Sequence, residues 1–156
     1  MTIDRTREEP SGRRLSLVVA SLRIGASFLG AAAVFHLLAA PHIGTMLRTL
    51  VDRKAYGFLE PILSFTFLLN AVLLVPLSFT TFYSASGIRR GEGWARPIAL
   101  VNALTVVALP CTMVATMGLR YFADAPLFLA GAVSVTAAGP FMLAALLWPR
   151  KGTGSD

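Results

Sequence analysis

The sequence has little charge, and over long stretches it has none. Charged residues make up 14 % of the chain, against about 25 % in a typical soluble protein, while hydrophobic residues make up 55 %. This composition argues against an ordinary water-soluble domain. Asp, Glu, Lys and Arg are absent from four windows: residues 24–47, 61–88, 97–119 and 125–149.

Each uncharged window is long enough to cross a lipid bilayer, because the hydrocarbon core needs only about 20 apolar residues of helix. We therefore predict an all-α fold, an integral membrane four-helix bundle. The first window is longer than the apolar region of a signal peptide, about 7–15 residues, so we expect it in the mature protein. The predicted spans are at about residues 16–40, 61–83, 97–119 and 126–148. Three of them are predicted to begin with a first-turn proline: Pro61, Pro97 and Pro126.

The spans and the loops between them form the predicted transmembrane domain, residues 15–149. The segments on either side are short: residues 1–14 and 150–156 are predicted cytoplasmic tails, and the first of them is predicted to be disordered or interfacial. Residues 42–60, between the first two spans, mix charged residues with apolar ones at helical spacing. This segment is predicted to form a short amphipathic helix on the outer interface.

The distribution of basic residues predicts the orientation. The amino terminus, residues 87–97 and the carboxyl terminus carry nine Lys and Arg, and the opposite loops carry four. Positive loops stay inside, so we expect a multi-pass protein of a bacterial inner (plasma) membrane with both termini cytoplasmic. The predicted topology and lipid anchors are Arg89, Arg90, Trp94, Arg96 and Trp148.

Basic residues also bear on the choice of partner. A net charge of +6 suits a nucleic-acid-binding protein, but here the basic residues occupy short segments between apolar runs. We expect no nucleic acid, and instead the lipid bilayer with anionic headgroups on the cytoplasmic side. Arg23 lies within the first span, near its basic end, and its side chain is expected to extend to those headgroups.

Polar and proline residues within the spans permit two interpretations. Each mid-helix proline frees a backbone carbonyl, which must find a partner in hydrocarbon. Together with two asparagines, these residues are candidates for a polar mid-membrane cavity. The favoured alternative is kinked helices joined by asparagine hydrogen bonds. The residues concerned are Asn70, Pro76, Asn102, Pro110 and Pro140.

Small residues spaced four apart predict helix packing, because they let helix backbones approach closely in lipid. The pattern occurs in the first span and in the fourth. These two helices are therefore predicted to pack against each other, within the bundle or across a dimer. The residues are Ala26 and Gly30 in the first span and Ala130, Ser134 and Ala138 in the fourth.

Metal-binding chemistry has few candidates. Cys111 is the single cysteine, which excludes an internal disulfide and a CxxC site. At the outer end, His36, His42 and Glu60 are candidate metal or haem ligands, although a third imidazole is absent. The favoured alternative is that His36 bonds a neighbouring helix and Glu60 caps the second span. We expect no cofactor.

The sequence carries no motif that indicates catalysis. The spans contain no acidic residue, and GxSxG, HExxH and phosphate-loop patterns are absent. We therefore expect a non-enzymatic accessory, assembly or scaffold subunit, as a homo-oligomer or with other membrane subunits. A small permease for a neutral or hydrophobic solute is the first alternative. A metal- or haem-binding membrane protein is the second.

Overall fold

The computed structural model describes residues 9–50, 53–124 and 126–147, and over these ranges the chain is helical apart from one turn. No strand occurs in the described ranges, so the predicted all-α class is confirmed. The elements are α1 (Glu9–Ala39), the 3-10 turn η2 (Ala40–His42), α2 (Ile43–Leu50), α3 (Arg53–Arg90), α4 (Ala95–Asp124) and α5 (Pro126–Leu147).

Three helices are long and apolar enough to span a membrane. Within the described residues the qualifying stretches are Gly12–Thr45, Leu59–Arg90 and Ala95–Thr112. They coincide with the first three predicted spans. The fourth predicted span coincides with α5, in which the described apolar stretch is the shorter Ala132–Leu143.

The helix boundaries differ from the predicted ones most clearly at two helix starts, and α3 and α4 also end later than predicted, at Arg90 and Asp124. The first helix begins at Glu9, so the end of the predicted tail is helical. The third helix begins at Arg53, and Pro61 therefore lies inside it; the prediction that Pro61 opens a helix was wrong. The extra turns form because Tyr56 and Leu59 pack on the apolar side of α2. Tertiary contact outweighs the local preference of proline for a first turn.

A short helix does follow the first span, as predicted. Pro41 ends α1 in the turn η2, after which α2 runs for eight residues. Its buried side chains, Ile43 and Leu47, pack against Phe67 of α3, whereas Arg48 is exposed. The apolar side of α2 therefore lies on α3.

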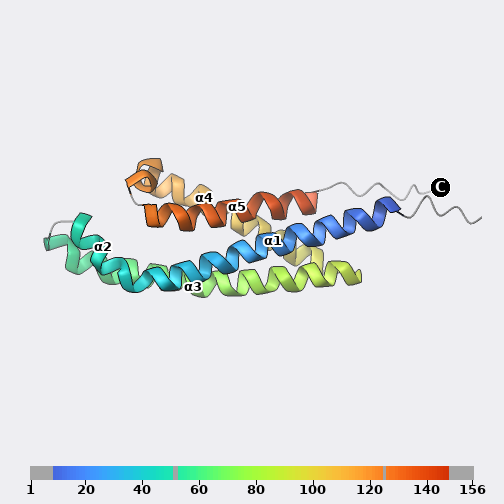
Figure 1. Ribbon diagram of the computed structural model, residues 1–156, viewed down its shortest axis with the longest axis horizontal. Coiled ribbons are helices and arrows are strands. Elements are labelled where there is room, and N and C mark those ends of the chain that lie inside the picture. Colours follow the sequence, from blue (N-terminus) through green and yellow to red (C-terminus); the bar gives the residue numbers. More distant parts are fainter. Residues whose placement is uncertain (1–8, 51–52, 125, 148–156) are drawn as a thin grey trace, which may run out of the picture.

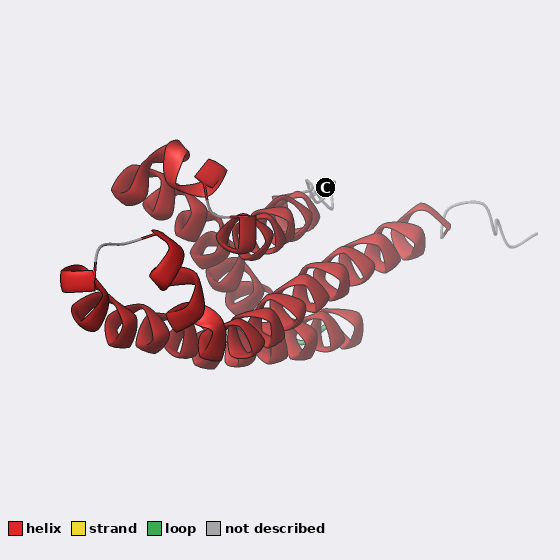
Figure 2. Ribbon diagram, turned by 60° about the vertical axis from the view of Figure 1, so that its left-hand side comes forward, coloured by secondary structure: helices red, strands yellow, loops and turns green. Residues whose placement is uncertain are grey.

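The helices pack mainly around α1. Figures 1 and 2 show α3 along one side of α1 and α5 along another, while α4 leaves the end of α3 and diverges from it to pack with α5. The main core lies where α1, α3, α4 and α5 meet. Its fully buried members include Leu22, Leu29, Val106 and Met142.

The outer surface carries many large apolar side chains. Large hydrophobic side chains are exposed along α1, α3 and α4, among them Phe65 and Val72 at 65 % and Phe79 at 68 %. A soluble helix normally buries one apolar stripe and exposes polar residues, whereas these helices are hydrophobic on all sides.

Candidate functional site

The turn between α3 and α4 is fixed by a C-terminal helix motif. Gly91 has a φ of +76°, its N–H donates to the Ile88 carbonyl at 3.1 Å, and the Glu92 N–H donates to the Gly87 carbonyl at 3.0 Å. This pair of bonds is a Schellman motif, for which glycine supplies the left-handed residue without steric cost. The chain therefore reverses within a few residues and starts α4 at Ala95.

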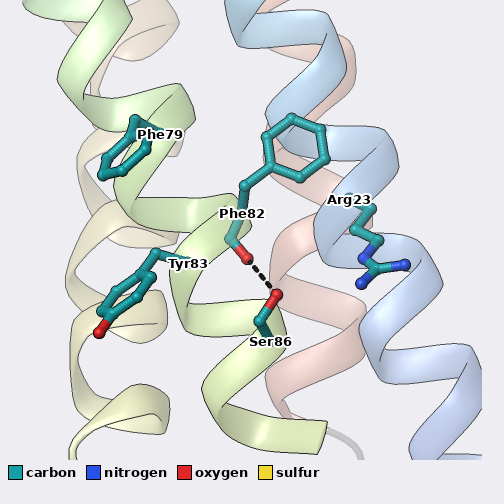
Figure 3. Close-up of a pocket in the computed structure, with 5 residues that line it drawn as sticks. All are labelled: Arg23, Phe79, Phe82, Tyr83 and Ser86. Atoms are coloured by element: carbon teal, nitrogen blue, oxygen red, sulfur yellow. Dashed lines mark hydrogen bonds between the residues drawn. The ribbon is translucent and has the colours of Figure 1, made fainter.

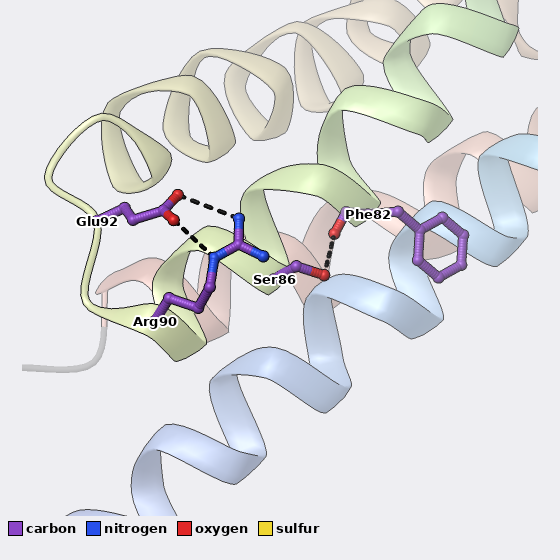
Figure 4. A network of polar contacts seen from close by, with 4 residues as sticks. All are labelled: Phe82, Ser86, Arg90 and Glu92. Carbon is purple, nitrogen blue, oxygen red and sulfur yellow. Dashed lines mark hydrogen bonds and ion pairs between the residues drawn. The ribbon is translucent and has the colours of Figure 1, made fainter.

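An exposed ion pair lies in the same turn. The guanidinium of Arg90 donates to both carboxylate oxygens of Glu92, at 2.6 and 3.3 Å (Figure 4). The hydrogen bond from Arg90 lowers the pKa of Glu92 below its ordinary value of 4.5, and the positive charge of Arg90 contributes in the same direction. Two of the predicted anchors thus have different surroundings, since Arg89 is exposed and Arg90 is paired.

The other predicted anchors hold helices together. Trp94 stacks on Tyr83 with ring centroids 4.9 Å apart. Arg96 donates to the carbonyl of Leu146 at 2.7 Å, so the first turn of α4 caps the last turn of α5. A guanidinium at this position satisfies an orphan carbonyl and complements the helix dipole. Trp148 lies outside the described residues.

Asn102 is the polar centre of the α3–α4 interface. It is only 7 % exposed, and its amide donates to Thr80 at 2.8 Å and to Thr81 at 3.1 Å. Both threonine hydroxyls donate in turn to carbonyls one helical turn back, at Pro76 and Leu77. These bonds satisfy the donors of Asn102 inside the fold and leave it unsuited to lining a path for solute.

The sequence analysis did not predict the small side chains that pack around this network. Ala95, Ala99 and Ala103 of α4 and Ala85 of α3 are fully buried, and Ala99, Ala103 and Ala85 belong to the same core cluster. The close approach is visible at Gly87, where an added Cβ would lie 2.7 Å from the Cβ of Ala95. The spacing of four between the alanines was the signal that could have identified this interface.

The first and fourth spans pack against each other as predicted, but the glycine at their contact is Gly25, whereas the predicted one was Gly30. An added Cβ at Gly25 would lie 2.6 Å from Cγ of Met142 and 3.4 Å from the carbonyl oxygen of Ala138, so Gly25 is the close approach to α5. Ala138 is fully buried, as expected.

The other two small residues of α1 serve a different helix. The carbonyl of Ala26 accepts a hydrogen bond from Ser78 of α3 at 2.8 Å, and Gly30 also faces Ser78. Ser134 is partly buried and has contacts of its own, and the side chain of Ala130 lies outside those described.

The remaining residues of the predicted cavity have unlike surroundings. Pro76 and Pro140 are exposed and Pro110 is partly buried. Asn70 is partly buried on α3, and within the described part of the chain its amide makes no hydrogen bond. Asn70 therefore differs from Asn102, although the sequence treats the two alike.

The predicted metal ligands do not form one site, and the alternatives also need correction, because His36 bonds a carbonyl of its own helix and Glu60 lies inside α3 and does not cap it. His36 is buried, its Nδ1 lies 2.7 Å from the carbonyl oxygen of Ala32, and its ring packs on Phe67 at 5.1 Å. His42 is exposed, and the carboxylate of Glu60 lies against Gly44 of α2. Among the described residues no group of three His, Cys, Asp or Glu side chains could hold a metal ion.

An open pocket of about 360 Å³ lies between α1 and α3. Figure 3 shows Arg23 on the α1 side of this pocket and the α3 residues on the other. The α3 residues share one side of their helix because they are spaced by three or four positions. They are Phe79, Phe82, Tyr83 and Ser86.

Comparison with protein-family models, with curated proteins and with solved structures finds no match for this chain. The fold and the contacts described above are therefore the basis for the functional argument.

Proposed function

We propose that the protein is an integral membrane scaffold or accessory subunit that associates with a second copy of itself along α3. In this proposal α1, α3, α4 and α5 all cross the bilayer. Support comes from the three helices of spanning length and from the large apolar side chains on their outer surface. Hydrocarbon is the solvent in which such a surface is stable.

The proposed orientation has both termini in the cytoplasm of a bacterial inner membrane. The start of α1, the end of α3 and the end of α5 lie at the same end of the structure (Figure 1). That end carries Arg13, Arg14, Arg89 and Arg90, and its aromatic pair Tyr83 and Trp94 suits the headgroup level. Positive charge favours the cytoplasmic side, which supports this orientation.

The observation that carries the proposed association is the amide of Asn70, which makes no hydrogen bond to any residue that the structure describes. It lies thirteen residues before Tyr83, or about 20 Å along the helix, which would place it within the hydrocarbon. An amide without a hydrogen bond in an apolar medium costs several kcal/mol. A neighbouring chain can remove this cost.

A second copy of the same chain is the partner that suits the amide best. An asparagine side chain carries both a donor and an acceptor, so two of them can bond reciprocally. A two-fold interface brings each residue close to its own copy, which makes that pairing possible. The side chains beside Asn70 on α3, Thr66 and Leu73, are partly or largely exposed and leave room for another helix.

Substitution of Asn70 by Leu is expected to reduce self-association. Asparagine pairs between membrane helices are worth about 0.6–2 kcal/mol, so the dimer should weaken about 3- to 30-fold. The measurement is energy transfer between two labelled populations of the full chain in liposomes, as a function of protein-to-lipid ratio.

The matched control is Asn102→Leu. Because Asn102 bonds within its own chain, this variant should lower thermal stability and leave the energy transfer unchanged. Equal association of wild type and Asn70→Leu would contradict the proposal, as would loss of association in Asn102→Leu alone. Association of Asn70 with a different membrane protein would retain an accessory role and reject the self-associating scaffold.

A further inference from the structure

The pocket between α1 and α3 is lined by one cationic side chain, that of Arg23. Arg23 is partly buried, and in the described part of the chain no hydrogen bond or ion pair engages its guanidinium. Two other arginines of this end differ, since Arg90 is paired with Glu92 and Arg96 with the Leu146 carbonyl. An unpaired guanidinium carries five donors, and it attracts planar or tetrahedral anions.

The register of the helices places Arg23 near the membrane surface. Gly30 faces Ser78 across the antiparallel α1–α3 contact, and Arg23 lies two turns nearer the basic end, level with Phe82 and Ser86 (Figure 3). Ser86 is four residues, about 6 Å, from Arg90 at the end of α3. In a bilayer this is the depth at which phospholipid phosphates meet the acyl chains.

The opposite wall of the pocket is aromatic and apolar. Phe79 is 68 % exposed and Phe82 is 38 % exposed, and both lie on the side of Ser86 that leads away from the turn. The pocket thus has a cation at the surface end and exposed rings that continue toward the middle of α3. A phospholipid has the matching order, with a phosphate above and an acyl chain below.

We propose that this pocket binds one anionic phospholipid of the cytoplasmic leaflet, with its phosphate on Arg23 and an acyl chain along Phe82 and Phe79. The anionic class follows from charge complementarity, because Arg23 is the one charged side chain among the residues that line the pocket, and no lining carboxylate could hold the ammonium group of a zwitterionic headgroup. The inference requires the membrane placement of the proposed function but not association through Asn70.

The test is native mass spectrometry of the full chain in detergent micelles, titrated separately with phosphatidylglycerol, phosphatidylcholine and inorganic phosphate. Phosphatidylglycerol should form a one-to-one adduct that survives activation. Arg23→Gln should lower its affinity at least about tenfold, since a charge-assisted pair is lost. Arg23→Lys, which keeps the charge, should retain most of the affinity for phosphatidylglycerol.

Arg89→Gln is the matched control, because it removes the same charge from the same end outside the pocket. Its adduct should stay within about twofold of the wild type. Equal losses in Arg89→Gln and Arg23→Gln would overturn the proposal in favour of general attraction to charge. An undiminished adduct in Arg23→Gln, equal binding of phosphatidylcholine, or displacement by inorganic phosphate would also overturn it.

Removing Arg23 should not prevent folding, because a cation within a spanning helix disfavours insertion. A thermal unfolding curve of Arg23→Gln similar to that of the wild type will confirm that the comparison is between folded proteins. Phe82→Ala provides the second arm, since it shortens the apolar wall and keeps the cation. It should weaken phosphatidylglycerol binding and leave the charge of the pocket unchanged, and an unchanged affinity would contradict the assigned acyl position.

Discussion

At the scale of single residues, the same side chain has different roles in different surroundings. Asn102 and Asn70 are both asparagines of apolar helices, yet among the residues that the structure describes only Asn102 finds hydrogen-bond partners. The sequence indicates that both are polar groups that need partners, but the partner depends on which residue of the next helix lies opposite. That information comes from helix register, which no single-chain pattern encodes.

The arginines illustrate the same point. Sequence analysis assigned Arg96 to topology, and its charge does contribute to that count. Its contact with the Leu146 carbonyl also gives it a structural role at the end of α5. Arg23, which was expected to extend to headgroups, lines a pocket together with residues of α3.

Acid should weaken the turn between α3 and α4. The pKa of Glu92 is lowered by its hydrogen bond with Arg90, so the ion pair stabilises the fold above the ordinary pKa of the carboxyl group and loses this effect as the pH falls through the lowered value. Glu92→Gln should therefore unfold at a lower temperature than the wild type near neutral pH. The difference should vanish in acid, in a series of thermal unfolding curves from about pH 7 to about pH 3.

Because the pair is exposed, the expected difference is small at all pH values and falls with added salt. A difference between wild type and Glu92→Gln that persists unchanged in acid would show that the carboxylate does not act through its charge.

At the scale of helices, length and apolar content were predictable, whereas the packing partners were not. The uncharged windows coincide with the long helices, and each window has at least the roughly 20 residues that a helix needs to cross a hydrocarbon core. The spacing of Ala26 and Gly30 indicates a side of α1 that permits close approach, but α5 and α3 both approach α1, and these two residues face α3. Local propensity also failed at Pro61, where contact with α2 extends the helix.

The α1–α5 contact provides a test at this scale. Gly25→Val should destabilise the fold by about 1–3 kcal/mol, because the added Cβ would lie 2.6 Å from Cγ of Met142, which is fully buried, and 3.4 Å from the carbonyl oxygen of Ala138. Thermal or denaturant unfolding of the detergent-solubilised chain measures the change.

Gly12→Val is the control for helix propensity, since Gly12 lies in the same helix with nothing within 4 Å of an added Cβ. Its stability should match the wild type to within about 0.5 kcal/mol. A similar loss in both variants would mean that Gly25 matters to the backbone of α1 alone and that the packing on α5 is looser than described.

At the scale of the whole molecule, the account depends on the solvent. The buried polar side chains of Asn102 and Thr81 form hydrogen bonds within the fold, while many large exposed side chains are apolar. In water this arrangement would expose far more apolar surface than a soluble monomer tolerates. In a bilayer, the same surface faces lipid, Asn70 is left to a partner helix, and Arg23 lies at the level of phosphates.

Cysteine accessibility tests the lipid-facing surface most directly. With Cys111 replaced by Ser, single cysteines at Val72, Phe79 and Arg90 are treated with a membrane-impermeant maleimide in native vesicles of known orientation. Val72 and Phe79, which are 65 % and 68 % exposed in the fold, should label only after the membrane is dissolved. Arg90 should label from the cytoplasmic face alone. Rapid labelling of Val72 and Phe79 in intact vesicles would contradict the account.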